Sequence, residues 1–197
     1  MLLKDILELK RDLENQNLKL APGLAGLYGE ILVYKKLKEK FSKKGYTIEF
    51  DSGHSRADIS LKKDNKEIKI EVKTSRLKDE APGAVFGFAI NIKKCEEHRN
   101  TVFIHPTRGK LLGDFCYFDF IILVCLDDYF KNSEFYIFSR KIIEDNEKSL
   151  RNTSRQFSSL THRIIFVEES KNKEEITQFD RYLMKNKSKF RNWEIIG

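Results

Sequence analysis

The sequence predicts an α/β fold in which a central mixed β-sheet is flanked by helices. Segments in which apolar and polar residues alternate, as they do in half-buried strands, occur at residues 46–50, 66–73 and 85–92. Apolar residues at helical spacing occupy residues 24–41, ahead of the first of these strands. Residues 120–126 form a continuous apolar run, which is typical of a strand buried on both faces.

The chain length and composition predict one folded domain. The 197 residues can bury a substantial core, and a hydrophobic content of 40% argues against disorder. We expect a single domain over residues 1–197, because no low-complexity linker or internal repeat divides the chain. Its parts would be an N-terminal helix at residues 1–20, a core at 24–126, and C-terminal strands and a helix at 134–197.

The cysteines and the apolar runs indicate in which cellular compartment the protein is expected. Cys95, Cys116 and Cys125 are odd in number and lack the close spacing of a disulfide framework, so we expect reduced thiols. The N-terminus carries no apolar signal core. The longest apolar run, residues 118–126, is broken by Asp119 and is far shorter than the ~20 residues of a membrane-spanning helix. These features predict a cytoplasmic protein that does not associate with a membrane.

Four cysteine and histidine side chains raise the question of zinc. Cys95, His98, His105 and Cys116 could supply four ligands, but their spacings fit none of the usual close pairs. The alternative is that they are surface histidines and partly buried thiols. Both interpretations stay open at this point.

The chain is basic, with a formal net charge of +7 and a pI near 9.2. Clustered lysines and arginines bind phosphates by displacing counterions, so this charge favours a polyanionic partner. Many basic proteins nevertheless bind no nucleic acid, and charge alone does not separate a ligand-binding role from solubility.

Two helices are expected before the first strand. Residues 1–20 form an amphipathic helix that packs within the chain or against a second copy, with its stripe formed by Leu2, Ile6, Leu9 and Leu13. The stripe of residues 24–41 includes Glu30, a carboxylate that must meet a cation, a hydrogen-bond donor or water unless it tilts out to solvent. The apolar members of this second stripe are Leu27, Ile31, Tyr34, Leu37 and Phe41.

The later elements follow from the same patterns. Residues 74–82 are expected to form a loop, and residues 95–113 an irregular segment that could face a substrate. The remaining strands and helices are expected at 134–138, 140–152, 164–167 and 171–186.

Residues 58–73 predict a β-hairpin whose two arms bring charged groups together. A two-residue turn at Asp64-Asn65 would pair Ile59 with Ile70 and place Asp58 opposite Glu71. Cross-strand neighbours have Cβ atoms ~4.5–5.5 Å apart, so two carboxylates that meet there need a cation. Lys73 lies two residues beyond Glu71 and therefore shares its face of the strand.

This pattern resembles the PD-(D/E)XK nuclease superfamily, which has the restriction-endonuclease-like fold. The resemblance consists of an acidic helix residue, then Asp58, twelve intervening residues, and Glu71-Val72-Lys73, and it covers residues 24–126. One departure is that Ala57 stands where the motif has a proline. Residues 74–76, Thr-Ser-Arg, and the strand at 88–92 are similar to small type II restriction enzymes.

The resemblance implies a role for each matching residue. It makes Asp58, Glu71 and the backbone carbonyl of Val72 the ligands of Mg²⁺, for which Mn²⁺ could substitute. It places Lys73 beside the attacking water. Glu30 would assist at a second ion or through water, and whether one or two ions act stays open.

The implied substrate is double-stranded DNA, cut by a homodimer. A symmetric site cut on both strands suits a twofold-symmetric enzyme. Residues 134–197 would complete the fold or contact DNA, and His54 could instead be a plain turn residue. The candidate DNA-binding residues are His54, Arg56, Ser75, Arg76, Lys93, Lys94 and Arg108.

Other functions remain compatible with the sequence. Within the same fold, a DNA repair, junction-resolving or transposon-encoded nuclease is an alternative to a restriction enzyme. A different class is a catalytically silent module that binds nucleic acid or assembles with a partner and retains the hairpin as scaffold.

Overall fold

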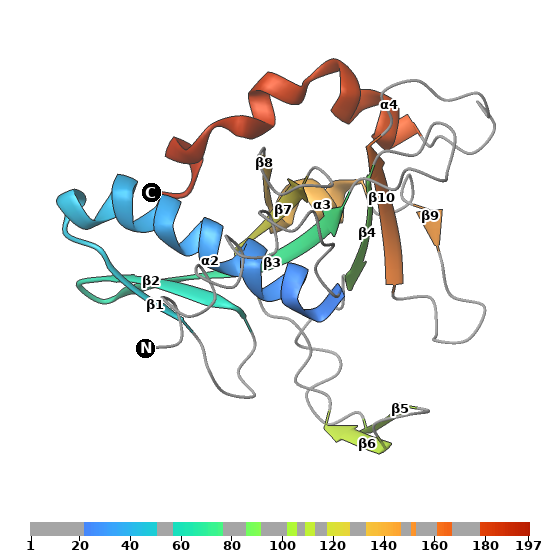
Figure 1. The fold of residues 1–197 in the computed structure, drawn as a ribbon, viewed down its shortest axis with the longest axis horizontal. Coiled ribbons are helices and arrows are strands. Elements are labelled where there is room, and N and C mark those ends of the chain that lie inside the picture. Colours follow the sequence, from blue (N-terminus) through green and yellow to red (C-terminus); the bar gives the residue numbers. More distant parts are fainter. Residues whose placement is uncertain are drawn as a thin grey trace, which may run out of the picture.

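The computed structural model describes a sheet with helices on both faces, a smaller sheet and an isolated hairpin (Figure 1). The described residues are 22–50, 57–76, 86–91, 102–105, 109–112, 118–126, 133–146, 151–152, 161–166 and 178–197. The expected helix at residues 1–20 lies outside them. None of the helices within these ranges has the length and apolar character needed to cross a membrane.

The central sheet has five strands in the order β1-β2-β3-β7-β8. The strands are β1 (Thr47–Phe50), β2 (Ile59–Lys63), β3 (Lys66–Arg76), β7 (Phe120–Leu126) and β8 (Ser133–Ser139). The β3–β7 pair is parallel, whereas the other neighbours are antiparallel, so the sheet is mixed. The predicted α/β fold with a mixed sheet and flanking helices is confirmed.

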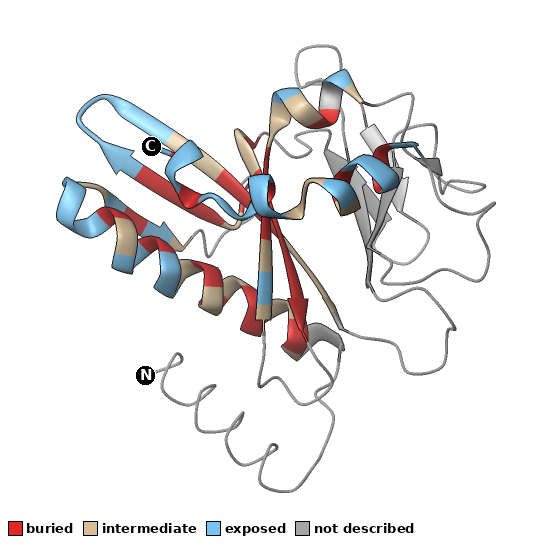
Figure 2. Ribbon diagram, turned by 90° about the horizontal axis from the view of Figure 1, so that it is seen from above, coloured by how far each residue is buried: buried red, intermediate tan, exposed pale blue. Residues whose placement is uncertain are grey.

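Helix α2 (Pro22–Phe41) covers one face of this sheet. Val33, Leu37 and Phe41 are buried on it, and they share a core with β3 residues such as Ile70 and Val72. Figure 2 shows the buried residues recurring along α2 and in the middle of the strands. A helix that buries a continuous apolar stripe on a sheet is stabilised chiefly by that packing.

The predicted stripe of α2 is confirmed in most positions. Ile31, Leu37 and Phe41 are buried, whereas Leu27 and Tyr34 are only partly buried. Tyr34 instead stacks on Phe50 of β1, with 4.4 Å between ring centroids.

The other face is covered by the C-terminal half of the chain. Helices α3 (Arg140–Asp145) and α4 (Gln178–Lys185) and the 3₁₀ turn η5 (Lys187–Arg191) contribute to a second core that includes Ile121 and Leu123 of β7. Since β7 alternates its residues between the two cores, it is buried on both faces, as its apolar run predicts. Two further 3₁₀ turns are η1 (Ser42–Lys44) and η6 (Trp193–Ile195).

A second, three-stranded antiparallel sheet has the order β4-β10-β9. Its strands are β4 (Phe86–Asn91), β10 (Thr161–Phe166) and β9 (Arg151–Asn152). The hairpin β5 (Val102–His105) and β6 (Gly109–Leu112) stands apart in Figure 1. Strand formation in the described parts of residues 95–113 corrects the expectation of an irregular segment.

Two other boundaries differ from the prediction. Strand β3 continues through the expected loop start at Thr74 to Arg76, because β7 pairs with it along that length. Helix α3 ends at Asp145 rather than near residue 152, and Asn146 closes it by donating its side-chain amide to the Ile142 carbonyl oxygen, 2.8 Å away.

Candidate active site

The predicted hairpin forms, and its turn sets the register. Asp64 adopts a φ of 53°, a left-handed conformation that Asp and Asn tolerate better than most residues. Ile59 pairs with Ile70, and Lys63 with Lys66 across the turn, as the sequence predicts. This register fixes which residues of β3 extend past the start of β2.

Asp58 immediately precedes the first paired residue of β2, and its side chain accepts a hydrogen bond from the main chain of β3. The Asp58 N–H donates to the Ile70 carbonyl oxygen at 3.0 Å, and the Val72 N–H donates to Asp58 Oδ2 at 2.7 Å. The expected ladder pair of Asp58 with Glu71 is therefore replaced by a side-chain contact one residue further along β3. Asp58 thus terminates the β2–β3 ladder and holds its carboxylate beside β3.

Glu71 and Lys73 share a face of β3, as predicted, and form an ion pair between Lys73 Nζ and Glu71 Oε1. Glu71 is only 7% exposed. Burial raises the pKa of the Glu71 carboxyl above its ordinary value, Lys73 opposes this, and the negative charge of Asp58 adds to it. A buried carboxylate that retains a cationic neighbour is a common feature of functional sites.

Glu30 belongs to α2, which packs on the face of β3 opposite to Glu71 and Lys73. Burial, followed by the charge of Asp58, raises the pKa of Glu30 from 4.5 to about 7, with Lys73 lowering it and Glu71 raising it. Each of the three other groups therefore acts on Glu30. The four predicted residues gather where β2 begins and β3 continues past it.

Asp119 supports this part of β3 and was not singled out from the sequence as a site residue. Its Oδ2 accepts from the Lys69 N–H at 2.8 Å, and its own N–H donates to the Lys69 carbonyl oxygen at 2.8 Å. The Asp119 carbonyl oxygen accepts from the Arg140 N–H, which ties the start of α3 to the same point. Asp119 therefore anchors β3 two residues before Glu71.

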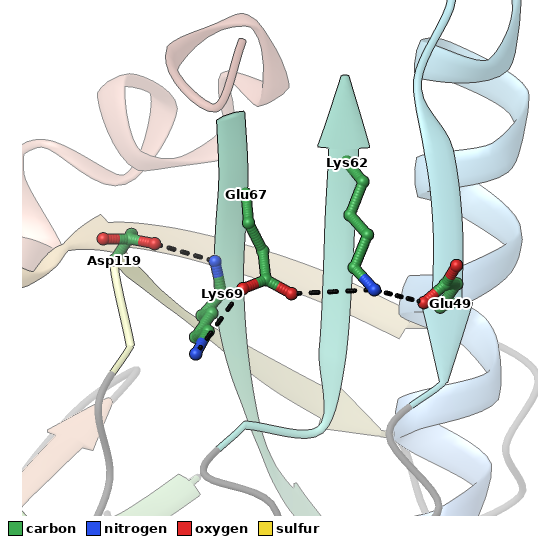
Figure 3. A network of polar contacts seen from close by, with 5 residues as sticks. All are labelled: Glu49, Lys62, Glu67, Lys69 and Asp119. Carbon is green, nitrogen blue, oxygen red and sulfur yellow. Dashed lines mark hydrogen bonds and ion pairs between the residues drawn. The ribbon is translucent and has the colours of Figure 1, made fainter. Parts of the chain in front are cut away.

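A row of surface ion pairs extends from Lys69 of β3 across β2 to β1 (Figure 3). Lys62 lies 2.7 Å from Glu49 and 3.8 Å from Glu67, and Lys69 lies 3.6 Å from Glu67. These largely exposed pairs contribute little stability each. They show that β3 carries two Glu-x-Lys pairs on one face, in which Glu71 is buried whereas Glu67 is exposed.

The chemistry of the gathered donors suits a hard divalent cation. Carboxylate and carbonyl oxygens are the ligands that Mg²⁺ prefers, and the mutual repulsion of Glu30, Asp58 and Glu71 would be relieved by positive charge. In the described part of the chain, no three His, Cys, Asp or Glu side chains are arranged as ligands of one ion. A metal here would therefore require side-chain rearrangement, including that of the Lys73 ammonium bound to Glu71.

Several predicted residues lie elsewhere. Ser75 is half-buried in β3, Arg76 ends that strand, and His105 ends β5. The candidates that fall outside the described residues are His54, Arg56, Lys93, Lys94 and Arg108 for DNA, and Cys95, His98 and Cys116 for zinc.

Comparisons with known proteins give one type of match. No protein-family model and no curated protein sequence matches the chain. Among solved structures, the chain is similar to a bacterial homing endonuclease, I-Ssp6803I, with 14% sequence identity and a TM-score of 0.39. The match covers 88% of this chain and 99% of that chain. At this TM-score and identity the similarity carries no argument about the activity of the chain.

Proposed function

We propose that the chain is a Mg²⁺-dependent endodeoxyribonuclease that hydrolyses DNA phosphodiester bonds, most specifically a type II restriction endonuclease. The observation that supports this proposal is the gathering of Glu30, Asp58, Glu71 and Lys73 where β2 begins. Burial of the Glu30 and Glu71 carboxylates costs free energy that a bound cation would offset. The raised pKa values of these two carboxyls, together with their place beside Asp58 and Lys73, support the proposal that the group is a functional site.

Each of these four side chains would have its own role in phosphodiester hydrolysis. Asp58, Glu71 and the Val72 carbonyl oxygen would hold Mg²⁺, with Glu30 assisting at a second ion or through water. A bound divalent cation supplies Lewis-acid polarisation of the phosphate and lowers the pKa of water. The Lys73 ammonium would hydrogen-bond the attacking water or stabilise the negative charge that develops on the phosphate oxygens.

We further propose that double-stranded DNA is the substrate and that two copies of the chain act together. The +7 charge favours phosphate binding, which should weaken steeply with salt. Cleavage of both strands at a symmetric site suits a homodimer.

The test uses plasmid DNA with Mg²⁺ or Mn²⁺, and β3 itself provides matched controls. Glu71→Gln and Lys73→Met should abolish cleavage. Glu67→Gln and Lys69→Met make the same substitutions in the Glu-x-Lys pair four residues earlier, whose glutamate is exposed, and should leave cleavage intact. Equal cleavage by wild type and both site variants would overturn the assignment of the site.

A second candidate function rests on the ion pair between Lys73 and Glu71 and on the absence, within the described ranges, of three converging ligands. These features also fit a catalytically silent nucleic-acid-binding module. Such a module would shift the mobility of DNA but would not cut it with either metal. If cleavage occurs, sequencing the DNA ends distinguishes site-specific cutting from the nicking or structure-specific action of a repair, junction-resolving or transposon-encoded nuclease.

A further inference from the structure

Helix α2 meets strand β3 closely at Gly29 and Thr74. Gly29 is buried, and a Cβ atom built on it would lie 1.9 Å from Thr74 Oγ1 and 3.0 Å from both Cβ and Cγ2 of Thr74. Real Cβ contacts are almost never shorter than 3.0 Å, so an alanine cannot occupy this position without a shift. The helix approaches the strand this closely because residue 29 has no side chain.

Both residues are direct sequence neighbours of the candidate site. Gly29 precedes Glu30, and Thr74 follows Lys73. Glu30 is also the only proposed site residue carried by α2, whereas Glu71 and Lys73 belong to β3. The separation of α2 and β3 at Gly29 therefore governs how far the Glu30 carboxylate extends toward the strand.

We propose that Gly29 and Thr74 are positioning residues, whose contact sets the distance from α2 to β3 and brings the Glu30 carboxylate to Asp58, Glu71 and Lys73. The catalytic consequence rests on the proposed nuclease function. The geometric consequence concerns the protein without any metal or DNA and is tested separately.

Rotation of the Thr74 side chain can move Oγ1 away from the new Cβ, but it leaves a tight contact that requires a shift of a few tenths of an ångström. The Cβ of Thr74 is fixed to the strand backbone and would itself lie 3.0 Å from the new Cβ, which is tighter than nine in ten real contacts. To reach ordinary van der Waals contact of 3.4 Å with the hydroxyl oxygen in its present rotamer, helix and strand must separate by about 1.5 Å.

The Thr74 hydroxyl is buried in this contact and makes no hydrogen bond within the described residues. Burying an unsatisfied hydroxyl costs ~1–3 kcal/mol. Hydrogen bonding therefore does not account for threonine at this position, whereas close packing against Gly29 does.

The same helix provides a matched control at Gly26. Among the described residues, no heavy atom lies within 4 Å of a Cβ built on Gly26. Gly26→Ala therefore makes the same substitution one turn earlier, with the same gain in helix propensity and without a clash. Thr74→Gly removes all three atoms that Gly29→Ala would meet and serves as the rescuing partner.

The experiment compares wild type, Gly26→Ala, Gly29→Ala, Thr74→Gly and the double variant Gly29→Ala/Thr74→Gly. Crystal structures without metal measure the separation between the Glu30 and Glu71 carboxylates. Calorimetry measures Mg²⁺ affinity, and single-turnover assays well below the melting temperature measure the cleavage rate per folded molecule at saturating DNA.

We expect Gly29→Ala to move the Glu30 carboxylate away from Glu71 by about 1 Å and to lower the cleavage rate about 100-fold, since misplacement of this size has such effects. DNA affinity should change little. Gly26→Ala should behave as wild type, and the double variant should recover the carboxylate position and most of the rate relative to Thr74→Gly alone.

An unchanged carboxylate separation in folded Gly29→Ala, or a failure of Thr74→Gly to restore it, overturns the proposal. If Gly29→Ala cleaves DNA at the wild-type rate per folded molecule, the contact has only a structural role, and the proposal is likewise overturned. If wild type never cleaves DNA, the proposed function is wrong, while the carboxylate separation still decides the positioning role.

Discussion

Replacing Glu30 with glutamine should stabilise the metal-free protein at alkaline pH while it impairs cleavage. Burial, with the charge of Asp58, raises the pKa of Glu30 from 4.5 to about 7. An acid whose pKa is higher in the folded state binds its proton more tightly there than in the unfolded chain. The stability of the wild type therefore falls as pH rises from 4.5 toward 7, and the full penalty is present above pH 7.

The size of the effect follows from the same shift. The difference between 4.5 and about 7 corresponds to at most ~3 kcal/mol. Glu30 is only half-buried, so screening by solvent reduces this, and we expect ~1 kcal/mol. For a domain of this size, that gain raises the melting temperature by about 2–4 °C.

The assay is thermal unfolding in the presence of a chelator between pH 5 and pH 8, for wild type and Glu30→Gln. The gain should be largest at pH 8 and should shrink as pH falls toward 4.5. Glu39→Gln, an exposed glutamate of the same helix, serves as the control and should change stability by less than ~0.5 kcal/mol. A Glu30→Gln variant that is less stable than wild type at pH 8, or equally stabilised at pH 5 and pH 8, would refute the reasoning.

Three further predictions concern the metal, the second core and an ion pair between Arg191 and Glu134. Calorimetry should show that Mg²⁺ affinity weakens as pH falls below about 7, because protonation of Glu30 removes negative charge from the site; equal affinity at pH 6 and pH 8 would contradict this. Phe138→Ala should cost ~3–5 kcal/mol in denaturant unfolding, since Phe138 is fully buried with its ring centroid 4.7 Å from that of Phe190. Arg191→Ala should cost ~0.5–1 kcal/mol at neutral pH by removing the ion pair of 2.5 Å with Glu134. Burial raises the pKa of Glu134, but hydrogen bonds from Tyr136 and Arg191 hold it below 4.5. This contribution is therefore fully present above pH 4.5 and should be lost in acid unfolding experiments as pH falls through the lowered pKa.

The hairpin could be predicted from sequence because its determinants are local. Alternation along β3 assigns each residue to a face, and the turn at Asp64 sets the pairing of Ile59 with Ile70. The uninterrupted apolar run of β7 likewise predicts burial on both faces, which its division between two cores confirms. In each case the pattern depends on neighbours a few residues away.

The remaining features depend on contacts between distant segments. The β4-β10-β9 sheet joins residues near 90 to residues near 160, and no local pattern specifies that pairing. Periodicity placed Glu30 on the buried stripe of α2, but the approach of α2 to β3 depends on the fit of Gly29 against Thr74. Glycine in a helical pattern was the available signal, since glycine inside a helix costs about 1 kcal/mol, but this signal applies equally to Gly26, which has no such contact.

The hydrogen bond from Val72 to Asp58 determines which inactive variant would be useful for trapping a DNA complex. Asp58 Oδ2 accepts a hydrogen bond from a main-chain donor where β2 begins, so alanine at this position would remove negative charge and also leave the Val72 N–H without its acceptor. Asparagine retains a side-chain oxygen that can accept the same bond, and it removes only the charge. Asp58→Asn therefore tests the chemistry of the carboxylate in a protein whose strand ending is preserved.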